Sequence, residues 1–464
     1  MPMLPRARAP PGLIMPSLRP ASFVCASCHR SQQQRQFSGT RAAGASSSSS
    51  HAPPPSAPPP ATGYARLTSR RLLSVAGRDA AKFLHGIITQ PVVNKEGAST
   101  SDKGAWTAFN APAEARTGNA ADLLGFYAGF LNATGRVLHD VFIYRDVLGL
   151  GTVEGKLAPG VEAFIVEVDA DQANALANHL KRYQLRSKVS YRILFPGECS
   201  VWQVWAAEPD PDSDSSTSST QQEWLAELKN SIVLPDNRAP GMGYRVLRRG
   251  DGELDLGLER SSDETYRIRR YLLGVAEGQA EILREQALPL DSNMDVMGGI
   301  DFRKGCYVGQ ELTIRTRHRG VVRKRILPCL LYPSTTESAP QQLEYKPYIN
   351  EEGDTQVTAE DIPSGSSIGR IGAKGRSAGT WLRGVGNIGL ALCRLPIMTD
   401  VELPGETATT APFDPAKDEF TVNWGADEET GNNEQSVKLK AFVPDWLRKT
   451  LPEDVDHVRR AKRW

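Results

Sequence analysis

Short runs of alternating apolar and polar residues predict strands along the first half of the chain, and two of them form a hairpin. Residues 125–131 and 136–144 flank the turn 132–135, which joins neighbouring strands. The other predicted strands are residues 71–77, 164–168, 189–194 and 201–205. Helices are expected at residues 79–88 and from Asp171, as the cap, to Tyr183. Hairpin strands mixed with helices predict an α+β fold rather than a doubly wound parallel sheet.

The second half of the chain predicts a small β-barrel. One more helix is expected after Asp263, its cap, and it ends near Gly274. Glycine-punctuated apolar runs follow at residues 321–331, 368–371 and 388–395, with no long helix among them. Residues 384–389 match G-x-G-x-x-G, but a strand-like run follows where a dinucleotide fingerprint needs a helix. We therefore predict a barrel without a dinucleotide site.

The N-terminal composition predicts mitochondrial targeting. Residues 1–37 contain five arginines, no lysine and no acid, and the first acidic residue of the chain is Asp79. An Arg- and Ser-rich start without acids or a continuous apolar segment is typical of a mitochondrial transit peptide, with an untargeted tail as the alternative. Arg35-Gln36-Phe37-Ser38 also resembles a matrix-peptidase site. We expect the mature protein in the mitochondrial matrix.

Polar segments divide the remainder into two predicted domains. A disordered Ser/Pro linker is expected at residues 38–63 and an α+β region at 64–327, interrupted by an acidic insertion at 207–222. The barrel with its polar insertions is assigned to residues 328–464. No apolar run is long enough to cross a bilayer, so we expect no membrane span.

The charge distribution argues against nucleic-acid binding. The net charge is +1, and the body that follows the basic leader is slightly acidic overall. A basic run from Arg315 to Arg325 lacks the aromatic residues that stack on bases. We expect these cations on the edge of a strand pair, where they could also attract a polyanion or lower the pKa of a thiol.

The histidines and most cysteines give no sign of a metal centre. The seven histidines never occur three or four residues apart, so a zinc site built from histidine alone is not indicated. Once Cys25 and Cys28 leave with the leader, four cysteines remain, far apart in the sequence. This spacing fits free thiols in a reducing compartment rather than a disulfide framework.

One cysteine stands out by its surroundings. In Lys304-Gly305-Cys306-Tyr307-Val308-Gly309-Gln310-Glu311, Cys306 lies between two glycines and two residues after a cation. The residues that follow alternate apolar and polar, so we predict a tight turn at the start of a strand, which presents the thiol. The alternatives are an inert, small hydrophobic side chain and a thiolate that attacks a substrate or binds metal.

This octapeptide, with Arg315 four residues on, resembles the K-G-C-[FY]-x-G-Q-E-x-x-x-R signature of the YgfZ-like branch of the glycine-cleavage T-protein (GcvT) superfamily. The resemblance covers most of residues 66–330 and, more loosely, the barrel. It implies an aminomethyltransferase-like folate-binding region followed by a β-barrel. Members with a mitochondrial leader are iron–sulfur cluster assembly factors, which act late with A-type carrier proteins to mature client [4Fe–4S] proteins.

The resemblance also implies roles for individual residues. Cys306 would be the essential thiol, either a ligand of a cluster shared with a partner or a nucleophile. Its surroundings would be shaped by Lys304, Gln310, Glu311 and Arg315. Tetrahydrofolate would bind in a cleft between the α+β region and the barrel, with wall candidates Asn132, Asp140, Asp236, Arg238, Arg245 and Asn293.

The T-protein itself has no cysteine in this motif, which argues against aminomethyl transfer and leaves enzymatic activity open. A folate-dependent one-carbon transferase of the aminomethyl type is the alternative function. A former enzyme that serves only as a scaffold is a third.

Overall fold

The computed structural model describes residues 57–92, 124–151, 158, 160–206, 228, 230–349, 357–372, 376–403, 413–425 and 435–451, and all structural statements concern these. They belong to one unit, Pro55–Trp464. The predicted transit peptide, most of the linker and the acidic insertion lie outside the described residues.

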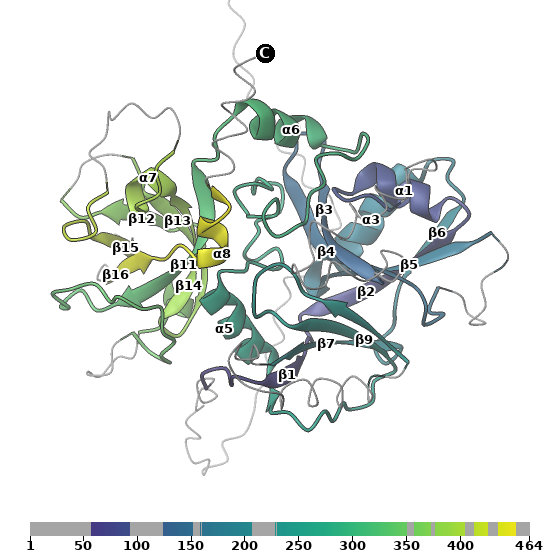
Figure 1. Ribbon diagram of the computed structural model, residues 1–464, viewed down its shortest axis with the longest axis horizontal. Helices are drawn as coiled ribbons and strands as arrows, with labels where there is room; N and C mark the ends of the chain where they lie inside the picture. The colour runs from purple at the N-terminus through teal and green to yellow at the C-terminus, as the bar shows by residue number, and fades with distance from the viewer. Residues whose placement is uncertain are drawn as a thin grey trace, which may run out of the picture. The chain divides into compact units, whose positions relative to one another are not determined.

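One five-stranded sheet contains the predicted hairpin and has the order β3-β4-β5-β2-β6 (Figure 1). Every neighbouring pair in it is antiparallel, and five of the six strands predicted in the first half of the chain belong to it. Its strands are β2 (Arg70–Gly77), β3 (Gly125–Leu131), β4 (Val137–Arg145), β5 (Glu162–Asp169) and β6 (Val189–Ile193).

A second five-stranded sheet has the order β10-β1-β7-β9-β8. Only the pairing of β1 with β10 is parallel. Its strands are β1 (Gly63–Arg66), β7 (Cys199–Trp205), β8 (Ser231–Pro235), β9 (Tyr244–Arg249) and β10 (Arg260–Ser261). Of these, the sequence analysis had predicted β7 alone.

The three predicted helices are present, but two of the expected caps were wrong. They are α1 (Ala80–Ile87), α3 (Ala173–Gln184) and α5 (Asp263–Leu273), which ends at left-handed Gly274 as predicted. Asp171 lies in the 3₁₀ turn η4 (Ala170–Gln172) instead of capping α3. Ser262 caps α5 through the amide of Thr265, whereas the Asp263 carboxylate accepts hydrogen bonds from Thr68 and Ser69. Asp263 is thus engaged by a long-range contact, whereas Asp171 takes part in its turn through its backbone amide, which donates to the Asp169 carboxylate.

The predicted C-terminal barrel is confirmed as a closed, antiparallel barrel of order β11-β14-β13-β12-β15-β16. Residues 384–389 form the tight connection between β13 and β14, which agrees with rejecting a dinucleotide site. The strands are β11 (Lys324–Tyr332), β12 (Ser367–Arg370), β13 (Gly379–Val385), β14 (Ile388–Arg394), β15 (Phe420–Trp424) and β16 (Gln435–Ala441). The short helical elements are η5 (Ala359–Asp361), α7 (Leu395–Met398) and α8 (Asp445–Arg448).

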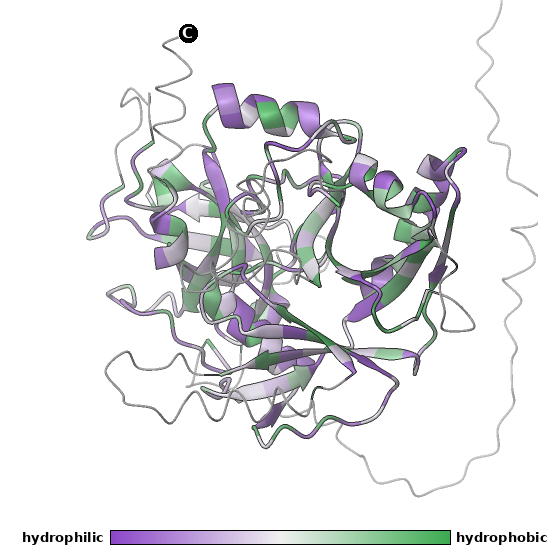
Figure 2. Ribbon diagram, turned by 45° about the vertical axis from the view of Figure 1, so that its right-hand side comes forward, coloured by the Kyte–Doolittle hydropathy of each residue, from purple (hydrophilic) through white to green (hydrophobic). Residues whose placement is uncertain are grey.

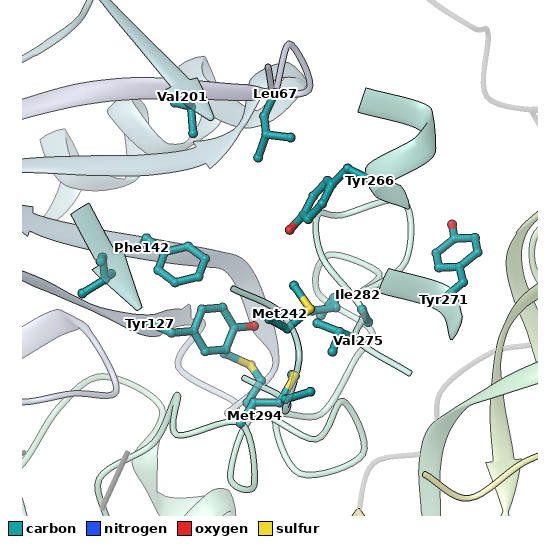
Figure 3. Packing of buried hydrophobic residues seen from close by; sticks show 14 of the residues in the cluster. Leu67, Tyr127, Phe142, Val201, Met242, Tyr266, Tyr271, Val275, Ile282 and Met294 are labelled. Atoms are coloured by element: carbon teal, nitrogen blue, oxygen red, sulfur yellow. The ribbon is translucent and has the colours of Figure 1, made fainter. Parts of the chain in front are cut away.

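Strand β4 is buried on both faces and therefore separates two hydrophobic cores. Val141 and Ile143 pack with α1 and α3 on one side of the sheet. Phe142 and Tyr144 face the other side, where a larger core joins both sheets, α5 and part of the barrel (Figure 3). Successive side chains of a strand point to opposite faces of the sheet. Polar side chains that point to the same face as Phe142 and Tyr144 are therefore also buried between the two sheets.

The residues after Glu311 form a helix, so the strand predicted there was wrong. Helix α6 (Gln310–Arg319) occupies this stretch, and the basic run begins on it rather than on a strand edge. Figure 2 colours much of this helix hydrophilic. Among the described residues, no helix is long and apolar enough to span a membrane.

Candidate functional site

Cys306 lies in an exposed loop between Asp301 and α6. Before the cysteine, Asp301 Oδ1 accepts hydrogen bonds from the amides of Arg303 (2.6 Å) and Lys304 (3.2 Å). After it, the amide of Val308 donates to the Gly86 carbonyl at 3.2 Å, next to the end of α1. The loop is thus anchored on both sides of the cysteine, whose exposure agrees with the prediction of a presented thiol.

Gly309 lets the start of α6 pack closely against the β3–β4 turn. It has φ +80°, and a Cβ added there would lie 2.2 Å from the Asn132 carbonyl oxygen. Gly135 faces it with φ +83°, and a Cβ there would lie 2.9 Å from the Gly309 oxygen. Gln310 completes the turn by accepting a hydrogen bond from the Tyr307 amide at 3.2 Å. Only glycine fits such left-handed, closely packed positions without strain.

Asn132 belongs to this same contact. Its side-chain oxygen accepts hydrogen bonds from the amide and hydroxyl of Thr134 and from the amide of Arg136, which fixes the turn. The structure therefore places Asn132 against the cysteine loop. Its expected contact with folate stays a prediction.

The ammonium group of Lys304 is directed at the end of α1. Its Nζ donates to the carbonyls of His85 (2.6 Å), Ile88 (2.5 Å) and Gln90 (3.2 Å), and lies 4.7 Å from the centre of the Tyr307 ring. Burial lowers the pKa of Lys304 to about 7, and Asp301 opposes that shift. A cation at a helix C-terminus satisfies orphan carbonyls and complements the helix dipole. In this geometry Lys304 positions the loop.

His85 is a neighbour of the loop that sequence reasoning missed. Its Nδ1 accepts a hydrogen bond from the Val92 amide at 3.3 Å, and its Nε2 lies 4.0 Å from the position of a Cβ added to Gly305. Partial burial and the Lys304 ammonium lower the pKa of His85, so its neutral form is favoured. Only the fold brings α1 to this loop, and a lone histidine carries no sequence signal for that contact.

Glu311 and Arg315, the remaining signature residues, are exposed on α6. Neither side chain makes a hydrogen bond or ion pair with a residue that the structure describes. The signature thus combines an anchored turn with an open helix face.

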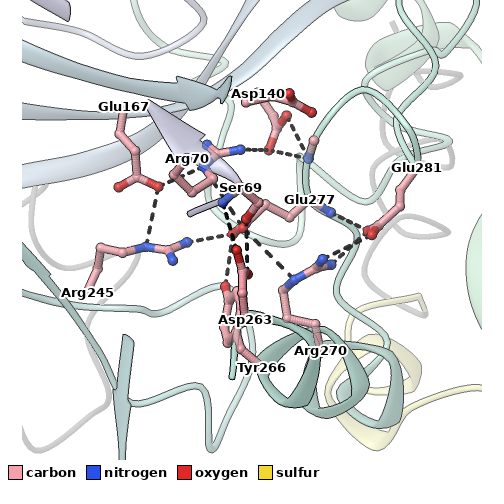
Figure 4. A network of polar contacts seen from close by, with 12 residues as sticks. Ser69, Arg70, Asp140, Glu167, Arg245, Asp263, Tyr266, Arg270, Glu277 and Glu281 are labelled. Carbon is pink, nitrogen blue, oxygen red and sulfur yellow. Dashed lines mark hydrogen bonds and ion pairs between the residues drawn. The ribbon is translucent and has the colours of Figure 1, made fainter. Parts of the chain in front are cut away.

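Four of the other predicted residues, Asp140, Asp236, Arg238 and Arg245, belong to a buried network between the sheets, of which Figure 4 labels Asp140 and Arg245. Arg238 pairs with Asp236 (2.7 Å) and with Glu277 (2.8 Å), and Arg245 pairs with Glu277 at 2.5 Å. Asp140 accepts hydrogen bonds from the Gly278 amide and the Gln279 side chain. Sequence reasoning missed the remaining members, Arg70, Glu167, Arg270, Glu277 and Glu281.

The network leaves its arginines mostly committed to carboxylates. Burial alone would raise the pKa of Glu277, but Arg245, Arg238 and Arg70 hold it well below its usual range. Burial raises the pKa of Asp140, which Arg70 only partly offsets. Buried ion pairs of this kind offset their desolvation cost only with full hydrogen bonding, and both terminal nitrogens of Arg70 lack a hydrogen-bond partner within the described part of the chain.

A pocket opens next to this network. Arg238 is the one predicted residue among its walls, with its guanidinium carbon 4.8 Å from the centre of the Phe142 ring. The aromatic rings of Tyr127 and Phe142, which belong to the same core, could cover a flat heterocycle. The lining residues are Gln90, Gly125, Phe126, Tyr127, Phe142, Leu234, Pro235, Asn237, Arg238 and Met297.

Asn293 lies elsewhere, where the barrel meets the preceding segment. It has φ +60°, and its amide donates to the Ile326 carbonyl at 2.7 Å. Within the described part of the chain, no three His, Cys, Asp or Glu residues are grouped so that they could hold a metal ion. A metal or cluster bound at Cys306 would therefore need ligands beyond those that this part of the chain groups together.

The barrel matches a known domain family. A family model described as "CAF17, C-terminal beta-barrel domain" matches residues 323–449, which span β11 to β16. Among solved structures, the glycine cleavage system aminomethyltransferase T from Bartonella henselae aligns with a TM-score of 0.47 and 12% identity, covering 83% of this chain and 86% of that one.

Three fungal relatives carry the name "Iron-sulfur cluster assembly factor IBA57 homolog, mitochondrial". The Pyricularia oryzae protein is 49% identical and covers 84% of this chain and 86% of its own length. The corresponding values are 47%, 85% and 85% for Chaetomium globosum and 42%, 99% and 96% for Neurospora crassa. With such identity across both sheets, the cysteine loop and the barrel, this chain belongs to the IBA57 family of mitochondrial iron–sulfur cluster assembly factors.

Proposed function

We propose that this protein acts in the mitochondrial matrix to mature [4Fe–4S] proteins, by offering the Cys306 thiolate as one ligand of a cluster shared with an A-type carrier. The observation that carries the proposal is the exposure of Cys306 on an anchored loop. A thiolate must be accessible to bind iron held by another protein.

The other described cysteines are poorly suited to this role. Cys329 and Cys393 are fully buried inside the barrel, with their sulfur atoms 3.9 Å apart. Cys199 is half-buried, and burial raises its pKa to about 12. Cys306 is therefore the described cysteine best placed to meet a partner.

The need for a partner follows from cluster chemistry. An iron–sulfur cluster is usually held by four thiolates, and this loop supplies one. We infer that the carrier holds the cluster through its own cysteines and that Cys306 completes the ligand set during assembly. The assembled [4Fe–4S] cluster would then pass to client [4Fe–4S] proteins.

Replacing Cys306 with serine tests this function. In cells that express only Cys306→Ser, the activities of matrix [4Fe–4S] enzymes should fall at least tenfold while the protein level stays normal. Cys199→Ser is the matched control and should retain activity. Normal [4Fe–4S] enzyme activity with Cys306→Ser would overturn the proposal.

We also propose that the pocket beside Arg238 binds tetrahydrofolate. The aromatic side chains in its walls fit the faces of a pterin ring. Arg238 is not expected to bind the ligand by hydrogen bonds, because its donors are already directed at Asp236, Tyr266 and Glu277. Asn237 is an exposed wall residue, so Asn237→Trp should block the pocket without disturbing the core. Calorimetric titration with tetrahydrofolate should show binding to the wild type that Asn237→Trp abolishes; equal binding by both proteins would place the ligand elsewhere.

The same titration separates the alternative function, a one-carbon transferase. Binding without transfer of a methylene or methyl group supports an assembly factor that responds to folate. Turnover that survives Cys306→Ser would instead favour a transferase.

A further inference from the structure

Helix α6 has a distinct inner side and outer side. Thr313 is its buried residue, and its exposed residues are Glu311, Arg315, His318 and Arg319. At about 100° per residue, these four lie within an arc of about 100° opposite Thr313. We refer to them as the outer face of α6.

The inner side is held by contacts with neighbouring elements. Leu312 packs against the β3–β4 turn, where its Cβ lies 3.0 Å from the position of a Cβ added to Gly135. The guanidinium of Arg317 lies 5.2 Å from the centre of the Phe302 ring. These contacts fix which side of α6 is turned to solvent.

The outer face carries arginines without acidic partners. The side chains of Arg315 and Arg319 make no ion pair or hydrogen bond with any residue that the structure describes. Among other exposed arginines, Arg260 and Arg448 pair with Glu253 and Asp400, whereas Arg145 and Arg186 form no ion pair with a described residue. The guanidinium groups of Arg315 and Arg319 remain available to a carboxylate on another molecule.

The charge is concentrated around the cysteine loop. Residues 301–325 contain eight lysines and arginines and two acids, Asp301 and Glu311, in a chain whose net charge is only +1; one of the eight, Arg325, is buried against Asp295. The remainder of the chain is therefore acidic overall. A local positive field of this kind orients an approaching partner toward the face that bears Cys306.

We propose that the outer face of α6 docks an acidic surface of the protein that shares the cluster with Cys306; this inference rests on the proposed function. The face immediately follows Cys306 in the chain, and Gly309 ties the start of α6 to the same hairpin turn that supports the loop. Docking through Arg315 and Arg319 brings the partner to the helix that begins four residues after Cys306.

The composition of the face favours a transient protein contact. It contains no Phe, Tyr or Trp, the side chains on which nucleic-acid surfaces mainly stack bases. It also lacks an apolar centre, which a stable interface needs. Charge complementarity instead accelerates encounter and leaves dissociation fast, as a handover of a cluster requires.

The test compares two charge reversals of equal size. Arg315→Glu/Arg319→Glu inverts the outer face, and Arg145→Glu/Arg186→Glu is the control. Arg145 and Arg186 are also exposed, and Arg145 ends β4 at the strand terminus remote from the hairpin turn. The probe is a purified A-type carrier protein loaded with its cluster, and association rates are measured by stopped flow at about 50 and 300 mM salt, where surface charges are screened to different degrees.

We expect the α6 reversal to slow association by about tenfold or more at low salt and to remove its salt dependence. The control reversal should change the rate less than threefold. Arg315→Gln/Arg319→Gln, which adds no negative charge, should give an intermediate rate. Circular dichroism confirms that each variant is folded.

Two outcomes would overturn the inference. One is an association rate for Arg315→Glu/Arg319→Glu that matches the control at both salt concentrations. The other is a preference of the same face for a single-stranded oligonucleotide over the carrier protein. Either result leaves the role of Cys306 intact, because that role is decided separately by [4Fe–4S] enzyme activity in the Cys306→Ser strain.

Discussion

His139 shows how a single buried side chain sets a pH limit on this fold. It lies on β4 with no exposed surface, and burial, with Arg284 and His179 nearby, lowers its pKa to about 3. His179, on α3, has its pKa lowered to about 4, chiefly by burial. Both imidazoles lie edge-on to the Phe130 ring. The folded protein therefore keeps them neutral well below the usual pKa of histidine.

Neutral burial of His139 predicts a loss of stability in mild acid. His139 binds a proton near pH 6.5 in the unfolded chain but only near pH 3 in the folded chain. Its contribution to stability is therefore fully present above pH 6.5 and is lost as the pH falls through this window. The loss should be about 1.4 kcal/mol per pH unit for such a group. His139→Leu should reduce the slope of urea unfolding free energies between pH 6.5 and 4.5 by that amount, leaving the part that His179 contributes.

His318 provides the control for this measurement because it is exposed on α6. His318→Leu should keep the acid slope of the wild type. If His139→Leu and His318→Leu show the same slope, His139 is not the group that takes up the proton.

At the scale of elements, α6 shows why the sequence misled at the site itself. The alternation of Leu312 and Ile314 with polar residues matched a strand, yet Thr313 is the residue that is buried. A pattern of apolar positions reflects burial, and a helix that buries one side chain leaves almost no such pattern. The informative cues were Glu311 in the first turn and Arg317 to Arg319 in the last, which complement the helix dipole.

The β3–β4 hairpin could be predicted from the sequence, whereas the buried network could not. Strands β3 and β4 are joined by the five residues 132–136, so local patterns were sufficient to predict their pairing. Glu277, in the segment after α5, pairs with Arg238 in the β8–β9 loop and with Arg245 on β9, and no local spacing encodes that meeting. Cys306 was found because its signature is contiguous, whereas His85 comes from a distant helix.

The contact between the β3–β4 turn and the start of α6 predicts different tolerances for the two glycines beside Cys306. Gly309→Ala forces a left-handed side chain into the Asn132 carbonyl and should destabilise the protein by about 2–4 kcal/mol. For Gly305→Ala the nearest atom is His85 Nε2 at 4.0 Å, so its effect should stay within about 0.5 kcal/mol. Urea unfolding of the two variants measures this difference in stability. Equal losses in the free energy of unfolding would show that the β3–β4 turn moves to accommodate the added methyl group.

At the scale of the whole molecule, the barrel is joined to the α+β region by polar contacts as well as by a shared core. Ile326 and Leu330 of β11 belong to the central core together with Phe142 and Tyr266. Trp446 donates a hydrogen bond to the Leu273 carbonyl at the end of α5. The predicted boundary at residue 327 therefore falls inside β11, a strand that belongs to the barrel and also touches the central core.

Arg325 and Asp295 form the buried ion pair at this junction. Arg325 Nη1 and Nη2 lie 2.7 Å and 3.1 Å from the two Asp295 oxygens, and Nη1 also donates to the Leu290 carbonyl. Both side chains are almost fully buried. Removing one member of such a pair leaves an unpaired charge, which costs about 3–5 kcal/mol.

Arg325→Leu should therefore lower the free energy of unfolding by about 3–5 kcal/mol, whereas Arg325→Leu/Asp295→Leu should recover more than half of that loss because no buried charge remains. Calorimetry and tryptophan fluorescence should both report one transition, since Trp381 in the barrel and Trp202 in the β7 sheet belong to a unit that shares its central core. A barrel that melts separately in the wild type would contradict this coupling. If it melts separately only in Arg325→Leu, the ion pair is what makes the two regions unfold together.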